Sequence, residues 1–71
     1  MPYNIKEGPS NNNINVYATT QILQQIYSWT QKTFLATEVF PIYAYYYVQV
    51  NFSGVENRKK FEQAMMETFT A

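Results

Sequence analysis

The stretch that decides the fold is residues 42–52, which read IYAYYYVQVNF. Side chains of a β-strand alternate between its two faces, so this stretch predicts one strand with two unlike faces. The even-numbered face is largely apolar: Ile42, Ala44, Tyr46, Val48, Val50 and Phe52. The odd-numbered face carries phenols and amides: Tyr43, Tyr45, Tyr47, Gln49 and Asn51. We therefore expect the even-numbered side chains to face a core and the odd-numbered ones to form a surface.

Length and composition predict a single folded domain, residues 1–71, that a binding partner would stabilise. With 18% aromatic and only 14% charged residues, the chain does not have the composition of a disordered protein. At this length, burial barely offsets the loss of conformational entropy, roughly 1.5 kcal/mol per residue. Oligomerisation or a protein partner would bury further apolar surface.

The residue types present argue against metal, cofactor and enzyme. The chain has no Cys and no His, which excludes the usual ligand sets of zinc, haem and iron–sulfur clusters. No histidine is present to activate a hydroxyl. The one candidate base is Glu38, which follows the predicted helix that ends near Lys32. A structural role for Glu38 is favoured, so we expect no enzyme.

Charge and hydropathy predict a soluble cytoplasmic protein without membrane contact. Five basic and five acidic residues give a formal net charge of zero, so no long-range attraction to nucleic acid or anionic membrane is expected. The first residues carry no apolar run of the signal-peptide kind. The longest apolar stretch, residues 39–48, is half a membrane span.

The amino-terminal part predicts two strands and a helix. Residues 3–7 and 13–18 are compatible with strands, and the turn-forming residues 8–12 between them predict a hairpin. Thr19 or Thr20 is suited to cap a helix that runs to about Thr33. The apolar side of that helix carries Ile22, Leu23, Ile26, Tyr27, Trp29 and Phe34. Its opposite side is rich in glutamine.

The carboxyl-terminal part predicts two more strands and a second helix. Residues 35–40 are read as a strand, and Pro41 as a turn or bulge before the strand 42–52. Ser53 and Glu56 have the spacing of a capping box, which opens the second helix. The apolar side of this helix carries Val55, Phe61, Met65, Met66 and Phe69. Arg58 and Glu62 are four residues apart and can pair at its rim.

The resulting fold class is α+β, in the order β-β-α-β-β-α. We expect a two-layer sandwich in which a four-stranded antiparallel sheet carries both helices on one face. If strand 3–7 pairs with strand 13–18, it takes the place that the closing strand has in ferredoxin-like folds. The other face of the sheet then stays uncovered.

The uncovered face is the predicted functional surface. Tyr43, Tyr45, Tyr47, Gln49 and Tyr17 fall on it, and rings in such a row bury broad area against a protein. The alternative is that tyrosine simply suits a strand. The functional hypothesis is a small non-enzymatic interaction module, an assembly subunit or a small inhibitor or regulator, that binds a protein partner or its own copy as a homodimer.

A second hypothesis is single-stranded nucleic-acid or RNA binding. The same rings would stack on bases, aided by the basic cluster Arg58, Lys59 and Lys60. Tyr43-Ala44-Tyr45 resembles the aromatic third strand of RNA recognition motifs, but Pro41-Ile42 stands where that motif has a basic residue and a glycine. The cluster is also consistent with an exposed charged run that binds nothing.

Overall fold

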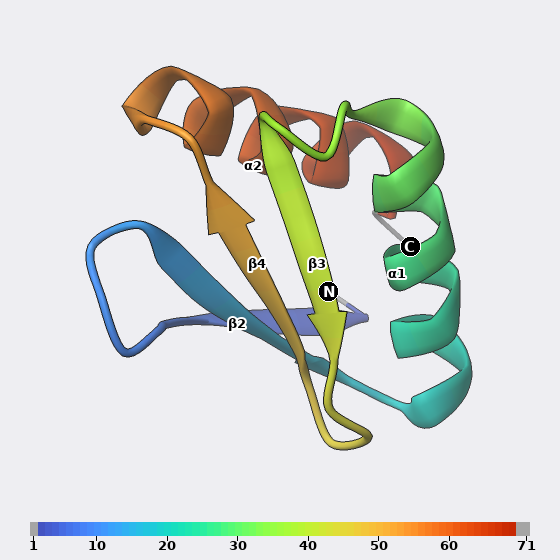
Figure 1. The fold of residues 1–71 in the computed structure, drawn as a ribbon. Coiled ribbons are helices and arrows are strands. Elements are labelled where there is room, and N and C mark those ends of the chain that lie inside the picture. The colour runs from blue at the N-terminus through green and yellow to red at the C-terminus, as the bar shows by residue number, and fades with distance from the viewer. Residues whose placement is uncertain (1, 70–71) are drawn as a thin grey trace.

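The computed structural model describes residues 2–69, and its four strands form one antiparallel sheet in the order β1-β2-β4-β3 (Figure 1). The elements are β1 (Tyr3–Glu7), β2 (Asn13–Ala18), α1 (Thr20–Thr33), β3 (Val39–Tyr43), β4 (Val48–Phe52) and α2 (Val55–Thr68). The predicted α+β class and the order β-β-α-β-β-α are confirmed.

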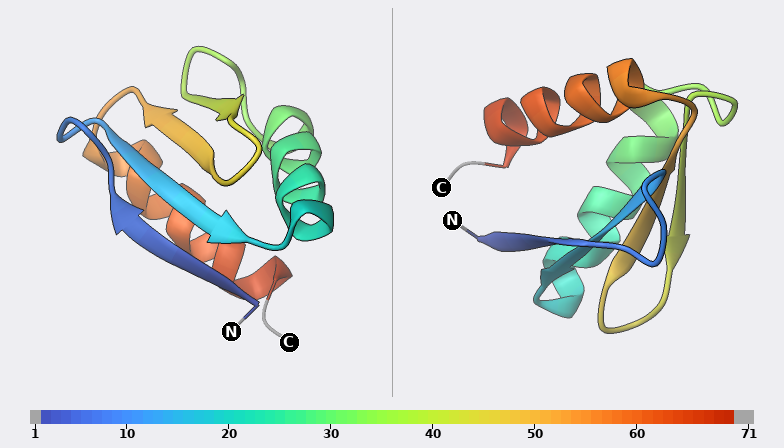
Figure 2. Two further views of the ribbon diagram at one scale, coloured as in Figure 1. Left: turned by 90° about the horizontal axis from the view of Figure 1, so that it is seen from below. Right: turned by 90° about the vertical axis from the view of Figure 1, so that its left-hand side faces the viewer.

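The topology places β1 at one edge of the sheet and β3 at the other (Figure 2). β2 and β3 are both antiparallel to β4, which lies between them, so they are parallel to each other. The connection through α1 therefore crosses over one strand, as in the split β-α-β unit. β1 pairs with β2 along its whole length and stands where ferredoxin-like folds have their closing strand, as the connectivity predicts.

The first helix forms where its sequence predicts. The Thr19 hydroxyl oxygen accepts a hydrogen bond from the Ile22 N–H at 3.4 Å and satisfies one free amide of the first turn. Leu23 and Ile26 are fully buried on the side that faces the sheet. α1 packs chiefly against β3, so it covers one half of the inner face.

The second helix begins at Val55 without the predicted capping box. Its N-cap residue is Gly54, with φ +95°, and no side chain caps the first turn. Ser53 instead accepts a hydrogen bond at its carbonyl oxygen from the Asn57 side chain, at 2.6 Å. The expected apolar side is also only partly correct, since Phe61 and Met65 are buried but Val55 and Met66 are exposed.

The core lies between the inner face of the sheet and the two helices. On the sheet it contains Ile14, Val16, Val39, Val48 and Val50, all 1% exposed or less. Where the helices meet, the Trp29 ring lies 5.8 Å from the ring of Phe61 and 5.2 Å from that of Phe69. The first contact is tilted and the second is edge-on, and aromatic contacts at such distances add to the stabilisation from buried apolar area.

Residues 42–52 form two strands and a turn, so the prediction of one continuous strand is wrong. β3 ends at Tyr43, β4 begins at Val48, and Ala44 donates its N–H to the Tyr47 carbonyl oxygen at 2.9 Å across the turn. The strand predicted at 35–40 begins only at Val39. Before it, the Leu35 carbonyl accepts the N–H groups of Glu38 and Val39, which makes a turn there.

Pro41 lies inside β3 and causes no break, contrary to the prediction. The bonds from Ala44 N–H to Tyr47 and from Ser53 N–H to Glu38 show that the even-numbered residues of β3 bond to β4. The nitrogen of Pro41 therefore points away from β4, where its missing hydrogen costs no ladder bond. A proline is tolerated at this edge position for that reason.

The turn reverses which residues of β3 face the core. In β4 the prediction is correct, because Val48, Val50 and Phe52 are buried. In β3 the buried residues are Val39 and Pro41, whereas Phe40 and Ile42 are exposed on the other side. Ile42 was expected in the core and lies outside it.

Candidate interaction surface

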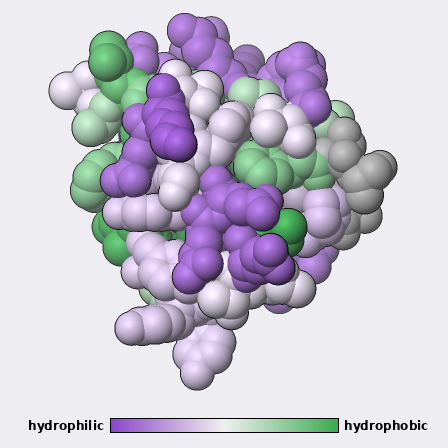
Figure 3. All heavy atoms as spheres, turned by 90° about the vertical axis from the view of Figure 1, so that its right-hand side faces the viewer, coloured by the Kyte–Doolittle hydropathy of each residue, from purple (hydrophilic) through white to green (hydrophobic). Residues whose placement is uncertain are grey.

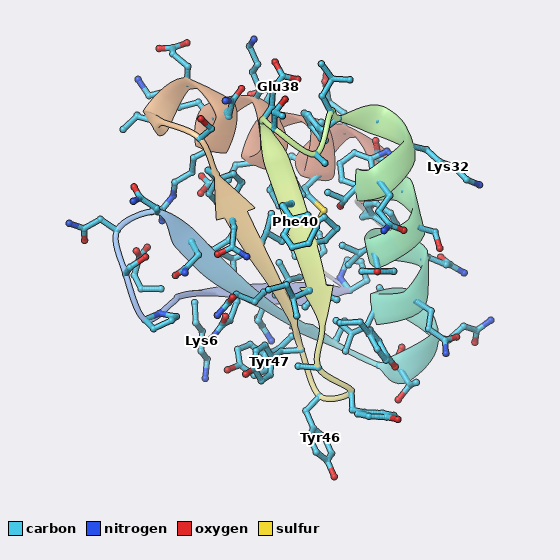
Figure 4. The ribbon with its side chains drawn as sticks, in the orientation of Figure 1. Lys6, Lys32, Glu38, Phe40, Tyr46 and Tyr47 are labelled. Atoms are coloured by element: carbon cyan, nitrogen blue, oxygen red, sulfur yellow. The ribbon has the colours of Figure 1, made fainter. Side chains whose placement is uncertain are left out.

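The sheet has one face without helices, which we call the open face. The strand registers assign nine residues to it: Asn4, Lys6, Asn13, Asn15, Tyr17, Phe40, Ile42, Gln49 and Asn51. Figure 4 looks onto this face, with Phe40 in front of β3 and Tyr47 at the lower end of the sheet. Lys6 is the only charged residue among the nine.

The apolar part of the open face is made by two neighbours on β3. Phe40 is 48% exposed and Ile42 is 44% exposed, although both stand in a strand of the sheet. They lie opposite Asn51 and Gln49 of β4 in the register. Large apolar side chains left uncovered in a sheet are candidates for contact with another molecule.

The aromatic part is a tyrosine pair beside one cation. The rings of Tyr17, on β2, and Tyr47, just before β4, have centroids 5.4 Å apart and are tilted by 37°. The Lys6 ammonium lies 5.3 Å from the Tyr17 ring centroid, within the range of a cation–π contact. The pair is therefore held in place by contacts within the face itself.

Amide side chains connect the strands across this face. Asn13 donates to the Asn51 side-chain oxygen at 3.2 Å, and Asn51 donates to the Phe40 carbonyl and the Gln49 side-chain oxygen, both at 3.3 Å. The side-chain oxygen of Asn15 is buried and has no hydrogen-bond partner within residues 2–69. The polar groups thus fix Phe40 and its neighbours and leave one acceptor unused.

The remaining tyrosines of the hairpin do not join the open face. Tyr43 belongs to the helix side, where its ring lies 6.1 Å from that of Tyr27 of α1. Tyr45 and Tyr46 form the exposed tip, and Figure 4 shows Tyr46 pointing away from the body of the molecule. Tyr45 has φ +63°, and the Tyr46 N–H bonds to the Ala44 carbonyl at 2.6 Å, which makes a tight and strained turn.

The predicted partner site is therefore brought together only in part. Of the five residues, Tyr17, Tyr47 and Gln49 share the open face, whereas Tyr43 turns inward and Tyr45 lies at the tip. The sequence interpretation missed Phe40 and Ile42. The sequence does contain a signal for them, which is the alternation of side chains through Val39-Phe40-Pro41-Ile42-Tyr43. This signal predicts a strand only if Pro41 is interpreted as a residue within an edge strand and not as the end of a strand.

The basic cluster lies on the helix side of the sheet. The Arg58 guanidinium bonds to the Glu7 carboxylate and, at 3.1 Å, to that of Glu62, which confirms the expected pair with Glu62 and adds Glu7. These hydrogen bonds to Glu7 and Glu62 raise the pKa of Arg58. Lys59 and Lys60 are exposed on α2, which packs on the opposite side of the sheet from the open face. The basic cluster and the Tyr17–Tyr47 pair therefore do not share a surface.

Other surfaces carry less chemistry. Figure 3 views the molecule from the side of α1, where hydrophilic residues gather, and the exposed side of that helix is rich in glutamine. A hollow of about 360 Å³ next to the start of α2 is lined by both apolar and charged residues, among them Phe52, Val55 and Lys59. The ion pairs found within residues 2–69 are those of Arg58, and none joins Glu38 to Lys32.

Metal-binding clusters and membrane-spanning helices are both absent from the described part of the chain. Between residues 2 and 69, no three residues of the His, Cys, Asp and Glu types come together as a metal ion would need. Neither α1 nor α2 has the length and hydropathy that a membrane crossing requires.

Comparisons of this chain with protein-family models, with curated proteins and with solved structures find no match.

Proposed function

We propose that this protein is a small non-enzymatic interaction module that binds a protein partner through its open face. It would act as an assembly subunit or as a small inhibitor or regulator of a larger protein. The observation that carries this proposal is the pair Phe40 and Ile42, 48% and 44% exposed on a face that the chain's own helices leave uncovered. The contacting rings of Tyr17 and Tyr47 lie on the same face.

The composition of the open face supports a protein as the partner. Interface centres are depleted of charge and enriched in aromatic residues, and the open face has one charge and three aromatic rings when Tyr47 is included. Its amides offer hydrogen-bond donors and acceptors around the rings, which would set the orientation of the partner. The contacts of Tyr17 with Tyr47 and Lys6 reduce the side-chain entropy lost on binding.

Nucleic-acid binding has less support. Stacking on single strands works together with a positively charged groove that follows the backbone. The open face offers Lys6 alone, and Arg58 is already bonded to Glu7 and Glu62. A nucleic-acid ligand would be detected by the same crosslinking experiment that tests protein binding.

Site-specific photo-crosslinking tests the proposal and does not require the partner to be identified beforehand. A photoreactive residue replaces Phe40, Ile42 or Tyr47 in turn, and the protein is produced in its own host and irradiated. The matched controls are Leu35, which is 67% exposed in the turn before β3, and Val55, which is 67% exposed at the start of α2. We expect one discrete protein adduct from the three open-face positions and none from the controls.

Three outcomes would contradict the proposal. The adducts could form equally from Leu35 and Val55, which would point to nonspecific contact. They could disappear after nuclease treatment, which would identify nucleic acid as the ligand. They could also be absent from all three open-face positions while the protein remains folded by circular dichroism.

A further inference from the structure

The two edges of the sheet differ in how their backbone groups are used. At the β3 edge, the outward N–H of Val39 donates to the Leu35 carbonyl at 3.0 Å, and Pro41 has no N–H to offer. Pro41 and the turn before β3 thus remove two of the outward donors of this edge. An edge treated in this way is a poor template for another strand.

The β1 edge has no such protection. The Gly8 N–H bonds to the Asn13 carbonyl at 3.3 Å, and the register continues evenly through β1, so Lys6 and Asn4 also bond to β2. The N–H and C=O groups of Tyr3, Ile5 and Glu7 therefore point outward. No strand within residues 2–69 pairs with this side of β1.

The charged side chains of β1 do not block the pairing of another strand with this edge either. Charged side chains commonly prevent edge pairing when they project beyond the strand. Here the Lys6 ammonium lies over the Tyr17 ring, and the Glu7 carboxylate bonds to Arg58. Both charges are held by contacts within their own chain.

Apolar side chains stand next to the free edge on its helix side. Ile5 is 37% exposed, and Met66 of α2 is exposed near it. Together with Tyr3, Asn4 and Glu62 they line a hollow of about 320 Å³ between β1 and α2. A second strand placed along β1 would cover this hollow.

We propose that two copies of this chain pair through antiparallel β1 strands, with Ile5 opposite Ile5 of the second copy. In this register the outward N–H and C=O groups of Tyr3, Ile5 and Glu7 meet their complements. Asn4 lies opposite the second copy's Lys6, and Tyr3 lies opposite its Glu7. No like charges face each other, whereas centring the pair on Lys6 would oppose the two lysines.

The second copy is the favoured occupant because β1 is complementary to itself. The strand is five residues long, and its central residue is the apolar Ile5. Antiparallel pairing about that residue uses the whole strand, buries Ile5 against its counterpart and joins two sheets of four strands into one of eight. A domain of 71 residues buries a small share of its apolar surface alone, and the dimer would bury more of it.

The symmetry of this dimer has a consequence for the open face. Paired residues of antiparallel strands lie on the same face, so the two-fold axis stands perpendicular to the joined sheet. Both open faces then point the same way. The dimer does not depend on the proposed function, but it would present Phe40, Ile42, Tyr17 and Tyr47 twice on one side.

Two charge variants at Asn4 test the dimer and its register. Sedimentation equilibrium over a concentration series is expected to show a reversible monomer–dimer equilibrium for the full chain. Asn4→Glu places a carboxylate opposite the second copy's Lys6 at both symmetric positions and should tighten dimerisation about threefold to tenfold. Asn4→Lys should weaken it by a similar factor, and added salt should reduce both effects.

A proline variant tests the use of the backbone edge. Ile5→Pro removes an outward N–H without breaking a bond to β2, as Pro41 does in β3, and should give a monomer that still folds. Ile5→Ala keeps the N–H and should retain a weaker dimer. If Ile5→Pro does not fold, the comparison of Asn4→Glu with Asn4→Lys alone tests the dimer.

The proposal is overturned if the wild-type chain has the mass of one copy at every concentration up to its solubility limit. It is also overturned if a dimer forms but Asn4→Glu and Asn4→Lys shift its dissociation constant in the same direction. A dimer that survives Ile5→Pro and is lost in Phe40→Ser would place the contact on the open face instead.

Discussion

The two faces of the sheet are built from the same four strands and differ in everything that their side chains do. Val16, Val48 and Val50 on the inner face are fully buried beneath the helices, and so is Ile14. Phe40 and Ile42 on the open face are nearly half exposed beside a row of amides. Strand propensity favours both sets of residues, so propensity cannot explain the difference. The inner apolar residues form the core, whereas the outer ones lie outside it, and this is why we propose that the outer ones bind a partner.

The largest expected effect is the contrast between two phenylalanines. Phe61→Ala removes a fully buried ring that packs on Phe52 and Trp29, and should cost about 3–5 kcal/mol of the free energy of unfolding. Phe40→Ala on the open face should cost less than about 1 kcal/mol, because its ring is half exposed. Urea denaturation of both variants measures the difference. Equal losses would mean that Phe40 is part of the core.

A smaller effect is expected at the tip of the β3–β4 hairpin. Tyr45 has φ +63°, a conformation that costs a side-chain-bearing residue about 1–2 kcal/mol relative to glycine. Tyr46 is 83% exposed at the same tip, compared with 75% for Tyr45, and has no positive φ. Both glycine variants gain the same freedom in the unfolded chain. Tyr45→Gly should therefore be more stable than Tyr46→Gly, by that amount less the contact of the Tyr45 ring with the Tyr43 ring, whose centroid lies 5.6 Å away. The opposite order in thermal unfolding would show that the turn is not strained.

The rim of the inner face should respond to alkaline pH through Tyr3. Burial, and to a smaller extent the negative charge of Glu62, raise the pKa of the Tyr3 phenol above its ordinary value of 10.0. Above pH 10 the unfolded chain therefore loses this proton before the folded chain does, and stability should fall as pH rises through the folded-state pKa. The free energy of unfolding measured at increasing pH should fall less for Tyr3→Phe than for the wild type. A parallel fall in both proteins would contradict the assignment.

The smallest expected effect concerns two asparagines of the open face. Asn15→Val removes a buried oxygen that has no partner within residues 2–69, and adds strand propensity, so it should stabilise the fold by up to about 1 kcal/mol. Asn51→Val is the control, since it removes hydrogen bonds to Phe40 and Gln49 and from Asn13, and should destabilise by a similar amount. Urea denaturation of both variants gives the two values. Destabilisation by Asn15→Val would show that this oxygen has a partner.

The sequence predicts the first half of the fold nearly to the residue, because the necessary local signals are present. Gly8 and Pro9 mark the β1–β2 turn, and Thr19 marks the start of α1. Alternation in β2 and β4 then identifies their inner faces correctly. These elements need no information from distant parts of the chain.

The β3–β4 hairpin is not predictable in the same way. Its tip is Tyr45-Tyr46, which contains no glycine, asparagine or proline, and the positive φ of Tyr45 is imposed by pairing of the flanking strands. Pro41 does not disrupt β3 because its nitrogen points away from β4. The direction of that nitrogen follows only from the register of the two strands. Each error displaced the predicted site: Tyr43 and Tyr45 were placed on the open face, and Phe40 and Ile42 were not.

The most direct test of the open-face assignment is an affinity comparison with the partner that crosslinking identifies. Isothermal titration would compare Phe40→Ser on the open face with Leu35→Ser, which changes an apolar residue 67% exposed outside it. If the open face binds the partner, Phe40→Ser should weaken binding by at least about tenfold, as expected for an aromatic anchor, and Leu35→Ser should leave the affinity unchanged. Equal affinity of wild type and Phe40→Ser, or a loss confined to Leu35→Ser, would contradict the account.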